Sequence, residues 1–148
     1  PLIVNRKTVD PTDPSSTPVI QIESAMGAAI EVFPGSQAIA VPRKRFRPVK
    51  STNELLLVQS DIFDLDADAN LVSRITHSEP AISLGKPYKF VPDYLARFPQ
   101  GVPGMRECTS LTVEADATFG ADVTCVGDVT ISGEPRVIPD GATLTGTL

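Results

Sequence analysis

The chain has 148 residues, enough for one ordinary domain or two small ones with a real hydrophobic core. Its formal net charge of -5 argues against a general nucleic-acid binder, which would carry a basic face. No apolar run approaches the roughly 18 residues that cross a bilayer, so we expect neither nucleic acid nor membrane among its partners. Apolar residues make up 41% and aromatic residues only 5%, which predicts an aliphatic core.

The first forty residues predict short strands around one helix. Residues 2–4 are expected to form a short buried strand, residues 5–17 an exposed loop, and residues 19–22 the returning strand. Residues 23–33 carry apolar side chains at helical spacing, and 38–41 predict another short strand. The residues at helical spacing are Met26, Ala29, Ile30 and Phe33.

A basic loop bounded by prolines occupies residues 42–50 and leads into a second predicted helix. Ser51 to Glu54 has the spacing of a capping box, and residues 55–58 supply the helix. Lys50 directly precedes this start, where free N–H groups bind anions, so Lys50 is our candidate for a phosphate contact. The alternative is a solvated basic loop, which spacing alone favours because no Walker-type glycine loop is present. The other basic residues of the loop are Arg43, Lys44, Arg45 and Arg47.

Other reactive residue types give weaker signals. His77, the only histidine, lies in polar sequence and is interpreted as a surface residue. The acids at 61–68 lack the glycine and terminal Glu of a calcium loop, which favours a solvated turn. Cys108 and Cys125 are too few for a disulfide framework or a zinc site, and predict reduced thiols in a cytoplasmic protein.

From Leu111 the sequence repeats every six residues. Two apolar residues flanking a Thr predict a short strand with its apolar side chains inward and the Thr outward, and a small residue and an acid predict the corner. Such hexads predict a left-handed parallel β-helix, and chance periodicity in an antiparallel sheet is the alternative. The apolar columns are Leu111, Ala117, Val123 and Val129, and Val113, Phe119, Cys125 and Ile131; between them lie Thr112, Thr118, Thr124 and Thr130.

Several runs resemble the carboxy-terminal half of the eukaryotic-type UTP–glucose-1-phosphate uridylyltransferases, the UDP-glucose pyrophosphorylases. The specific ones are Gln-x-Glu-x-Ala-x-Gly-Ala-Ala-Ile at 21–30 and Val-Pro-Arg-x-x-Phe-x-Pro-Val-Lys at 41–50. The resemblance covers essentially the whole chain, with Arg6 standing where the family has a proline. The remaining runs are residues 1–10, 16–20, 55–61, 95–98 and 111–113.

The resemblance implies a fold and a division of the chain. Residues 1–100 would be the carboxy-terminal part of a Rossmann-like α/β nucleotidyltransferase domain, 101–110 a linker, and 111–148 the left-handed β-helix. It also implies an enzyme of carbohydrate metabolism that makes UDP-glucose and pyrophosphate from UTP and glucose 1-phosphate with Mg²⁺. Lys50 matches the lysine that contacts substrate phosphates, as catalytic and phosphate-binding residue.

The family's glycine-rich UTP loop, metal-binding Asp and Asn-rich sugar strand belong to its amino-terminal part. We therefore expect this chain to be a carboxy-terminal fragment that is inactive alone and binds no metal itself. A second hypothesis is an interaction module that self-associates through the β-helix. A third, an acyltransferase, is disfavoured because such enzymes usually need more coils and a catalytic His near a coil interface, and His77 precedes the repeat.

Overall fold

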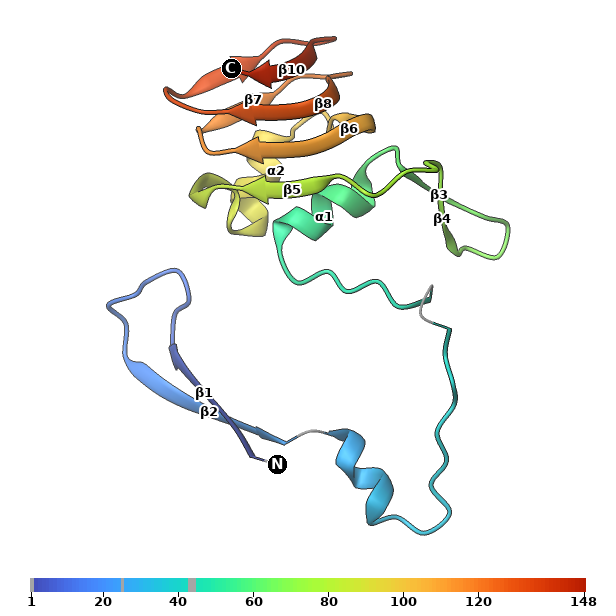
Figure 1. Cartoon of the computed structure of the whole chain (residues 1–148). Coiled ribbons are helices and arrows are strands. Elements are labelled where there is room, and N and C mark those ends of the chain that lie inside the picture. The colour runs from blue at the N-terminus through green and yellow to red at the C-terminus, as the bar shows by residue number, and fades with distance from the viewer. Residues whose placement is uncertain (1, 25, 43–44) are drawn as a thin grey trace. The chain divides into compact units, whose positions relative to one another are not determined.

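A computed structural model describes residues 2–24, 26–42 and 45–148 (Figure 1). The chain divides into two compact units, Pro1–Val41 and Pro42–Leu148, which are described separately. No helix in the described residues is long and apolar enough to span a bilayer.

The first unit is a hairpin followed by a short helix. Strand β1 (Leu2–Thr8) pairs antiparallel with β2 (Pro18–Ser24). The connecting loop is closed by the Val9 N–H, which donates to the Thr17 carbonyl at 3.0 Å, and by Asp10, whose carboxylate accepts the Thr12 N–H at 2.8 Å. A 3-10 helix, η1 (Met26–Glu31), follows.

Several sequence predictions for this unit need correction. The strands at 2–4 and 19–22 are present, but residues 2–4 are exposed and not buried. The expected amphipathic helix is only η1, with Ile30 and Phe33 exposed, and residues 38–41 form no strand. The side chains of Met26 and Ala29 lie outside the described part. Apolar periodicity stabilises a helix through packing, and Ile30 and Phe33 are 46% and 65% exposed.

The second unit begins with a helix and a small hairpin. Helix α1 (Thr52–Gln59) has the predicted capping box at Ser51 and Glu54. The antiparallel hairpin of β3 (Phe63–Leu65) and β4 (Leu71–Ser73) follows. Next come β5 (Ala81–Leu84), the 3-10 helix η3 (Lys86–Tyr88) and α2 (Val91–Arg97).

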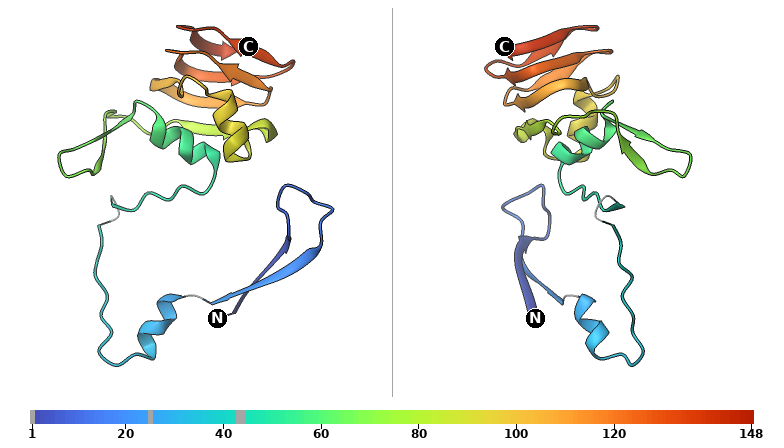
Figure 2. Two further views of the ribbon diagram at one scale, coloured as in Figure 1. Left: turned by 180° about the vertical axis from the view of Figure 1, so that it is seen from behind. Right: turned by 45° about the vertical axis from the view of Figure 1, so that its right-hand side comes forward.

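The rest of the unit is a stack of parallel strands. These are β6 (Gly104–Val113), β7 (Ala117–Phe119), β8 (Thr124–Ile131), β9 (Arg136–Ile138) and β10 (Thr143–Thr147). One sheet has the order β10-β8-β6-β5 and the other pairs β7 with β9, all parallel, so the chain alternates between two sheets. Figures 1 and 2 show this stack with α1 and α2 at the β5 end.

The hexad repeat accounts for the register and burial of this stack. Thr112 pairs with Thr130, three hexads later, and Thr130 pairs with Thr147. Every residue of both apolar columns is buried, as the sequence predicted, whereas the four Thr residues between them, which were expected to face solvent, are half-buried. Gly127, where the pairing of β8 with β6 changes register, and Gly133, after the end of β8, take positive φ values of 64° and 83°, which glycine adopts without strain.

The expected linker at 101–110 is largely wrong, because residues 104–110 belong to β6. Met105 and Cys108 are fully buried there, and β6 pairs with β8. The parallel stack also includes β5, upstream of the repeat. The hexad pattern starts at Leu111 and could not reveal these earlier strand residues, which pair with the same sheet without repeating its sequence.

An aromatic cluster joins the short helices to the stack. Phe98 lies 4.9 Å from Tyr94 and 4.8 Å from Phe119 of β7, measured between ring centroids. The buried Tyr88 hydroxyl donates to the Ala117 carbonyl at 2.7 Å and accepts the Ala117 N–H at 3.1 Å. Burial raises the pKa of Tyr88 to about 12.

Candidate functional site

Lys50, the predicted phosphate contact, is exposed and directly precedes the N-cap of α1. It ends the loop 45–50, which has no helix or strand apart from one 3-10 residue at Arg45. Ser51 is the N-cap and has an extended backbone, so the helix begins at Thr52. The lysine therefore reaches solvent from a defined position at the start of a helix.

The start of α1 is already occupied by a carboxylate. Glu54 accepts the Ser51 N–H at 2.7 Å and the Ser51 hydroxyl at 2.6 Å, and Ser51 Oγ accepts the Asn53 N–H at 3.3 Å. Hydrogen bonds from the Ser51 hydroxyl and then from its backbone N–H hold the pKa of Glu54 below its usual value. The expectation of free N–H groups beside Lys50 is therefore wrong for Ser51 and Asn53.

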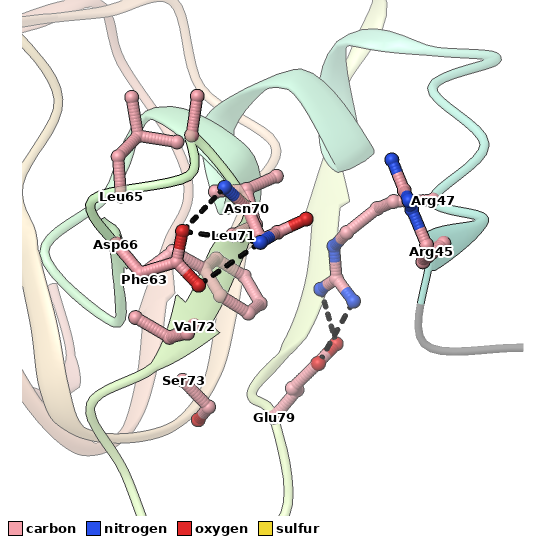
Figure 3. Close-up of a pocket in the computed structure, with 11 residues that line it drawn as sticks. Arg45, Arg47, Phe63, Leu65, Asp66, Asn70, Leu71, Val72, Ser73 and Glu79 are labelled. Carbon is pink, nitrogen blue, oxygen red and sulfur yellow. Dashed lines mark hydrogen bonds and ion pairs between the residues drawn. The ribbon is translucent and has the colours of Figure 1, made fainter. Parts of the chain in front are cut away.

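One arginine of the same loop, Arg47, is held by contacts with Glu79 and Phe63. Arg47 forms a bidentate ion pair with Glu79, with N–O distances of 3.0 and 2.6 Å (Figure 3). The Arg47 guanidinium carbon also lies 4.1 Å from the centre of the Phe63 ring. These contacts hold the loop three residues before Lys50. Sequence reasoning missed them because Arg47 and Glu79 are 32 positions apart.

An open pocket of about 900 Å³ lies beside this ion pair. The hairpin of β3 and β4 forms its apolar wall, and Arg45, Arg47 and Glu79 contribute charge. Within it, Asp66 accepts hydrogen bonds from the Asn70 amide at 3.1 and 3.0 Å, as Figure 3 shows. Lys50 is not among the described residues that line this pocket. The two basic positions Arg43 and Lys44 lie outside the described part of the chain.

The remaining candidates have structural roles. His77 is exposed and its ring nitrogens bond the carbonyls of Ser78 at 2.8 Å and Arg106 at 2.9 Å. Asp61 accepts the Met105 N–H at 2.7 Å, which ties the end of α1 to β6. Cys108 and Cys125 are free and buried, and a hydrogen bond with Cys108, together with burial, raises the pKa of Cys125 well above its usual value. Cys125 therefore packs in the core, as predicted.

In the described ranges 2–24, 26–42 and 45–148, no group of three or more His, Cys, Asp or Glu residues could hold a metal ion.

Comparison with known proteins gives one consistent result. The sequence family described as UTP--glucose-1-phosphate uridylyltransferase matches residues 1–126. The enzyme of that name from Hordeum vulgare is 44% identical over 97% of this chain, and a second from Dictyostelium discoideum is 38% identical over 95%. The aligned part is 30% and 28% of those two proteins, so the chain spans less than a third of their length.

Solved structures agree with the sequence comparison. A UDP-glucose phosphorylase from Trypanosoma brucei matches with a TM-score of 0.83 and 42% identity, over 100% of this chain and 34% of that one. A Leishmania major UDP-glucose pyrophosphorylase variant, solved with UDP-glucose, matches with a TM-score of 0.78 and 40% identity over 100% of this chain and 32% of that one. An α/β arrangement containing the parallel sheet is thus shared with part of these enzymes, and the chain belongs to the UTP–glucose-1-phosphate uridylyltransferase family.

Proposed function

We propose that this chain forms part of an enzyme that makes UDP-glucose and pyrophosphate from UTP and glucose 1-phosphate, and that Lys50 contacts substrate phosphate. The observation that carries this is the position of Lys50, exposed directly before the α1 N-cap within the stretch that the family matches. Its ammonium would neutralise the negative charge that develops as one phosphate attacks another. The Arg47–Glu79 ion pair supports a fixed position for the loop that carries it.

The role of Lys50 is tested in a full-length protein that contains this segment. We expect Lys50→Ala to lower kcat/KM about 100-fold or more, the usual loss when one preorganised charge or donor is removed from a transition state. Lys86→Ala, which removes another exposed lysine of the same unit, should leave kcat/KM unchanged. Wild-type activity in the Lys50→Ala protein would contradict the assignment.

The 148-residue chain alone is proposed to be inactive. It spans about 30% of the curated relatives, and its described residues provide no group that could hold a metal ion. We propose that the complete enzyme uses Mg²⁺ held by residues outside this chain, and that it works in the cytoplasm, where its two free buried thiols stay reduced. Detectable UDP-glucose synthesis by the isolated chain would overturn this.

We also propose that residues 111–148 wind as a short left-handed β-helix domain. The parallel pairing at three-hexad separation and the buried apolar columns support this reading. A crystal structure of the chain tests the handedness, and right-handed coils would refute it.

A second candidate function is self-association through the end of this stack. Strand β10 lies at the edge of its sheet. In the other sheet, Val137 of β9, the strand that precedes β10 in the chain, is 75% exposed. An open strand edge is a template for pairing with another chain. Light scattering that finds only monomers, both for this chain and for the full-length protein, would exclude this function.

A further inference from the structure

Two side-chain contacts hold the chain on either side of Lys50. Three residues before it, the Arg47 guanidinium donates two hydrogen bonds to the Glu79 carboxylate, at 3.0 and 2.6 Å (Figure 3). Three residues after it, the side-chain oxygen of Asn53 accepts the Leu84 N–H at 3.0 Å. Lys50 therefore lies midway between two points at which the chain is attached to another segment.

Both points of attachment belong to the same strand, β5, or to the residues directly before it. Glu79 lies two residues before the strand begins at Ala81, and Leu84 is its last residue. Strand β5 pairs in parallel with β6, so it is part of the stack. Pro80 between Glu79 and the strand is buried, and a proline restricts the residue before it to extended conformations. The Glu79 carboxylate is therefore presented from a well-defined backbone.

The geometry of the Arg47–Glu79 pair exceeds that of an ordinary surface ion pair, which contributes little to stability. The pair is bidentate, and the guanidinium carbon also lies 4.1 Å from the centre of the Phe63 ring. A carboxylate on one side and a ring on the other restrict the guanidinium in two directions. Residues 45–50 form neither an α-helix nor a strand, so these side-chain contacts have a large influence on where the loop lies.

The position of the loop matters because an ammonium stabilises transition-state charge in proportion to its proximity. The lysine side chain is a flexible four-carbon stem, so a mobile backbone would spread its charge over a wider volume. A misplacement of about 1 Å can cost about 100-fold in rate. We propose that Glu79 is a positioning residue: through Arg47 it holds the loop so that β5, and with it the stack of parallel strands, orients Lys50 toward substrate phosphate. This rests on the proposed role of Lys50.

The test is a double-mutant cycle in a full-length protein that contains this segment. Glu79→Gln removes the negative charge and keeps the shape of the side chain, and we expect it to lower kcat/KM about five- to tenfold. In the Lys50→Ala protein the same substitution should have no further effect, because no ammonium remains to be misplaced. A merely structural role would lower kcat/KM by the same factor in both proteins.

A second ion pair of the same unit gives a matched control. Arg97 forms a bidentate pair with Asp116, at 2.7 and 2.9 Å, and its guanidinium carbon lies 5.6 Å from the centre of the Tyr88 ring. The exposed fractions of its two side chains, 19% and 45%, resemble the 29% and 41% of the first pair. It joins α2 to the residue before β7, so Asp116→Asn should leave kcat/KM unchanged.

The outcomes separate the positioning by Glu79 from the role of Lys50. Wild-type kcat/KM in the Lys50→Ala protein would overturn both. A large loss in Lys50→Ala with no loss in Glu79→Gln would overturn the positioning alone. The positioning is also overturned if Glu79→Gln costs the same factor with and without the lysine, or if Asp116→Asn costs as much as Glu79→Gln.

Discussion

His77 is held between two backbone carbonyls, the oxygens of Ser78 and Arg106. A carbonyl oxygen only accepts, so both ring nitrogens can donate at once only in the protonated imidazolium. These two hydrogen bonds, that to Ser78 being the larger influence, raise the pKa of His77 above 6.5. They also join two segments 29 residues apart, so the protonation of this ring affects the stability of the unit.

The pH dependence follows from the sign of that shift. A folded pKa above the unfolded value gives stability that is fully present below the unfolded pKa of 6.5 and is lost as pH rises through the folded pKa. We expect the urea midpoint to fall between about pH 6 and 8 in the wild type, and to change less with pH in His77→Ala. Because His77 is the only histidine, its NMR titration is unambiguous, and a midpoint below 6.5 would contradict the prediction.

At the residue scale, local chemistry was predictable and distant pairing was not. The Ser51 and Glu54 spacing predicted the α1 capping box, because both groups act within one helical turn. The same capping box implies that the Glu54 carboxylate accepts the Ser51 N–H, so it already argues against a free donor at Ser51 beside Lys50. The Arg47 contact with Glu79 depends on how β5 and the loop pack, which no local motif encodes.

At the element scale, two buried tyrosines allow a comparison of hydrogen bonds with different partners. Tyr88 of η3 both donates to and accepts from the backbone of Ala117, which is buried in β7. Tyr94 of α2 donates to the side chain of Gln59, which is exposed. Removing the first hydroxyl leaves two buried backbone groups unpaired, whereas water can replace the second.

We therefore expect Tyr88→Phe to lower the free energy of unfolding by about 1–3 kcal/mol, because buried groups lose their partner. Tyr94→Phe should cost less, about 0.5–1.5 kcal/mol, as for an ordinary hydrogen bond. Urea denaturation monitored by circular dichroism measures both. Equal losses in the two variants would show that the hydrogen bonds of Tyr88 with Ala117 contribute no more than the exposed one of Tyr94 with Gln59.

The element scale also shows where sequence patterns succeed. The hexads predicted parallel pairing and inward apolar columns because each repeat buries apolar side chains at the same two positions. Strand β6 was missed over residues 104–110, since Gly104 and its neighbours resemble a linker while Met105 and Cys108 pack inward. In residues 1–41, strand propensity predicted β1 and β2, but burial was wrong because it requires a partner surface that this unit lacks.

At the scale of the whole molecule, the buried core belongs to one unit. Every buried hydrophobic residue in the described part lies between Leu56 and Leu144, inside Pro42–Leu148. In the described part of the first unit, the large hydrophobic side chains are exposed, and hydrogen bonds hold the hairpin and its connecting loop. The two units should therefore contribute very differently to stability.

We expect a chain of residues 42–148 to unfold cooperatively with a free energy within about 1 kcal/mol of the whole chain, since the deleted residues bury little apolar surface. Deletion of residues 134–148 is the matched control, because it removes β9 and β10 with the buried Ile138 and Leu144. Each of these side chains stabilises by about 1.5–3 kcal/mol when buried, so this shorter deletion should cost several times more. Urea denaturation of the three proteins measures these free energies of unfolding. A large decrease on removing residues 1–41 would mean that the first unit stabilises the second directly.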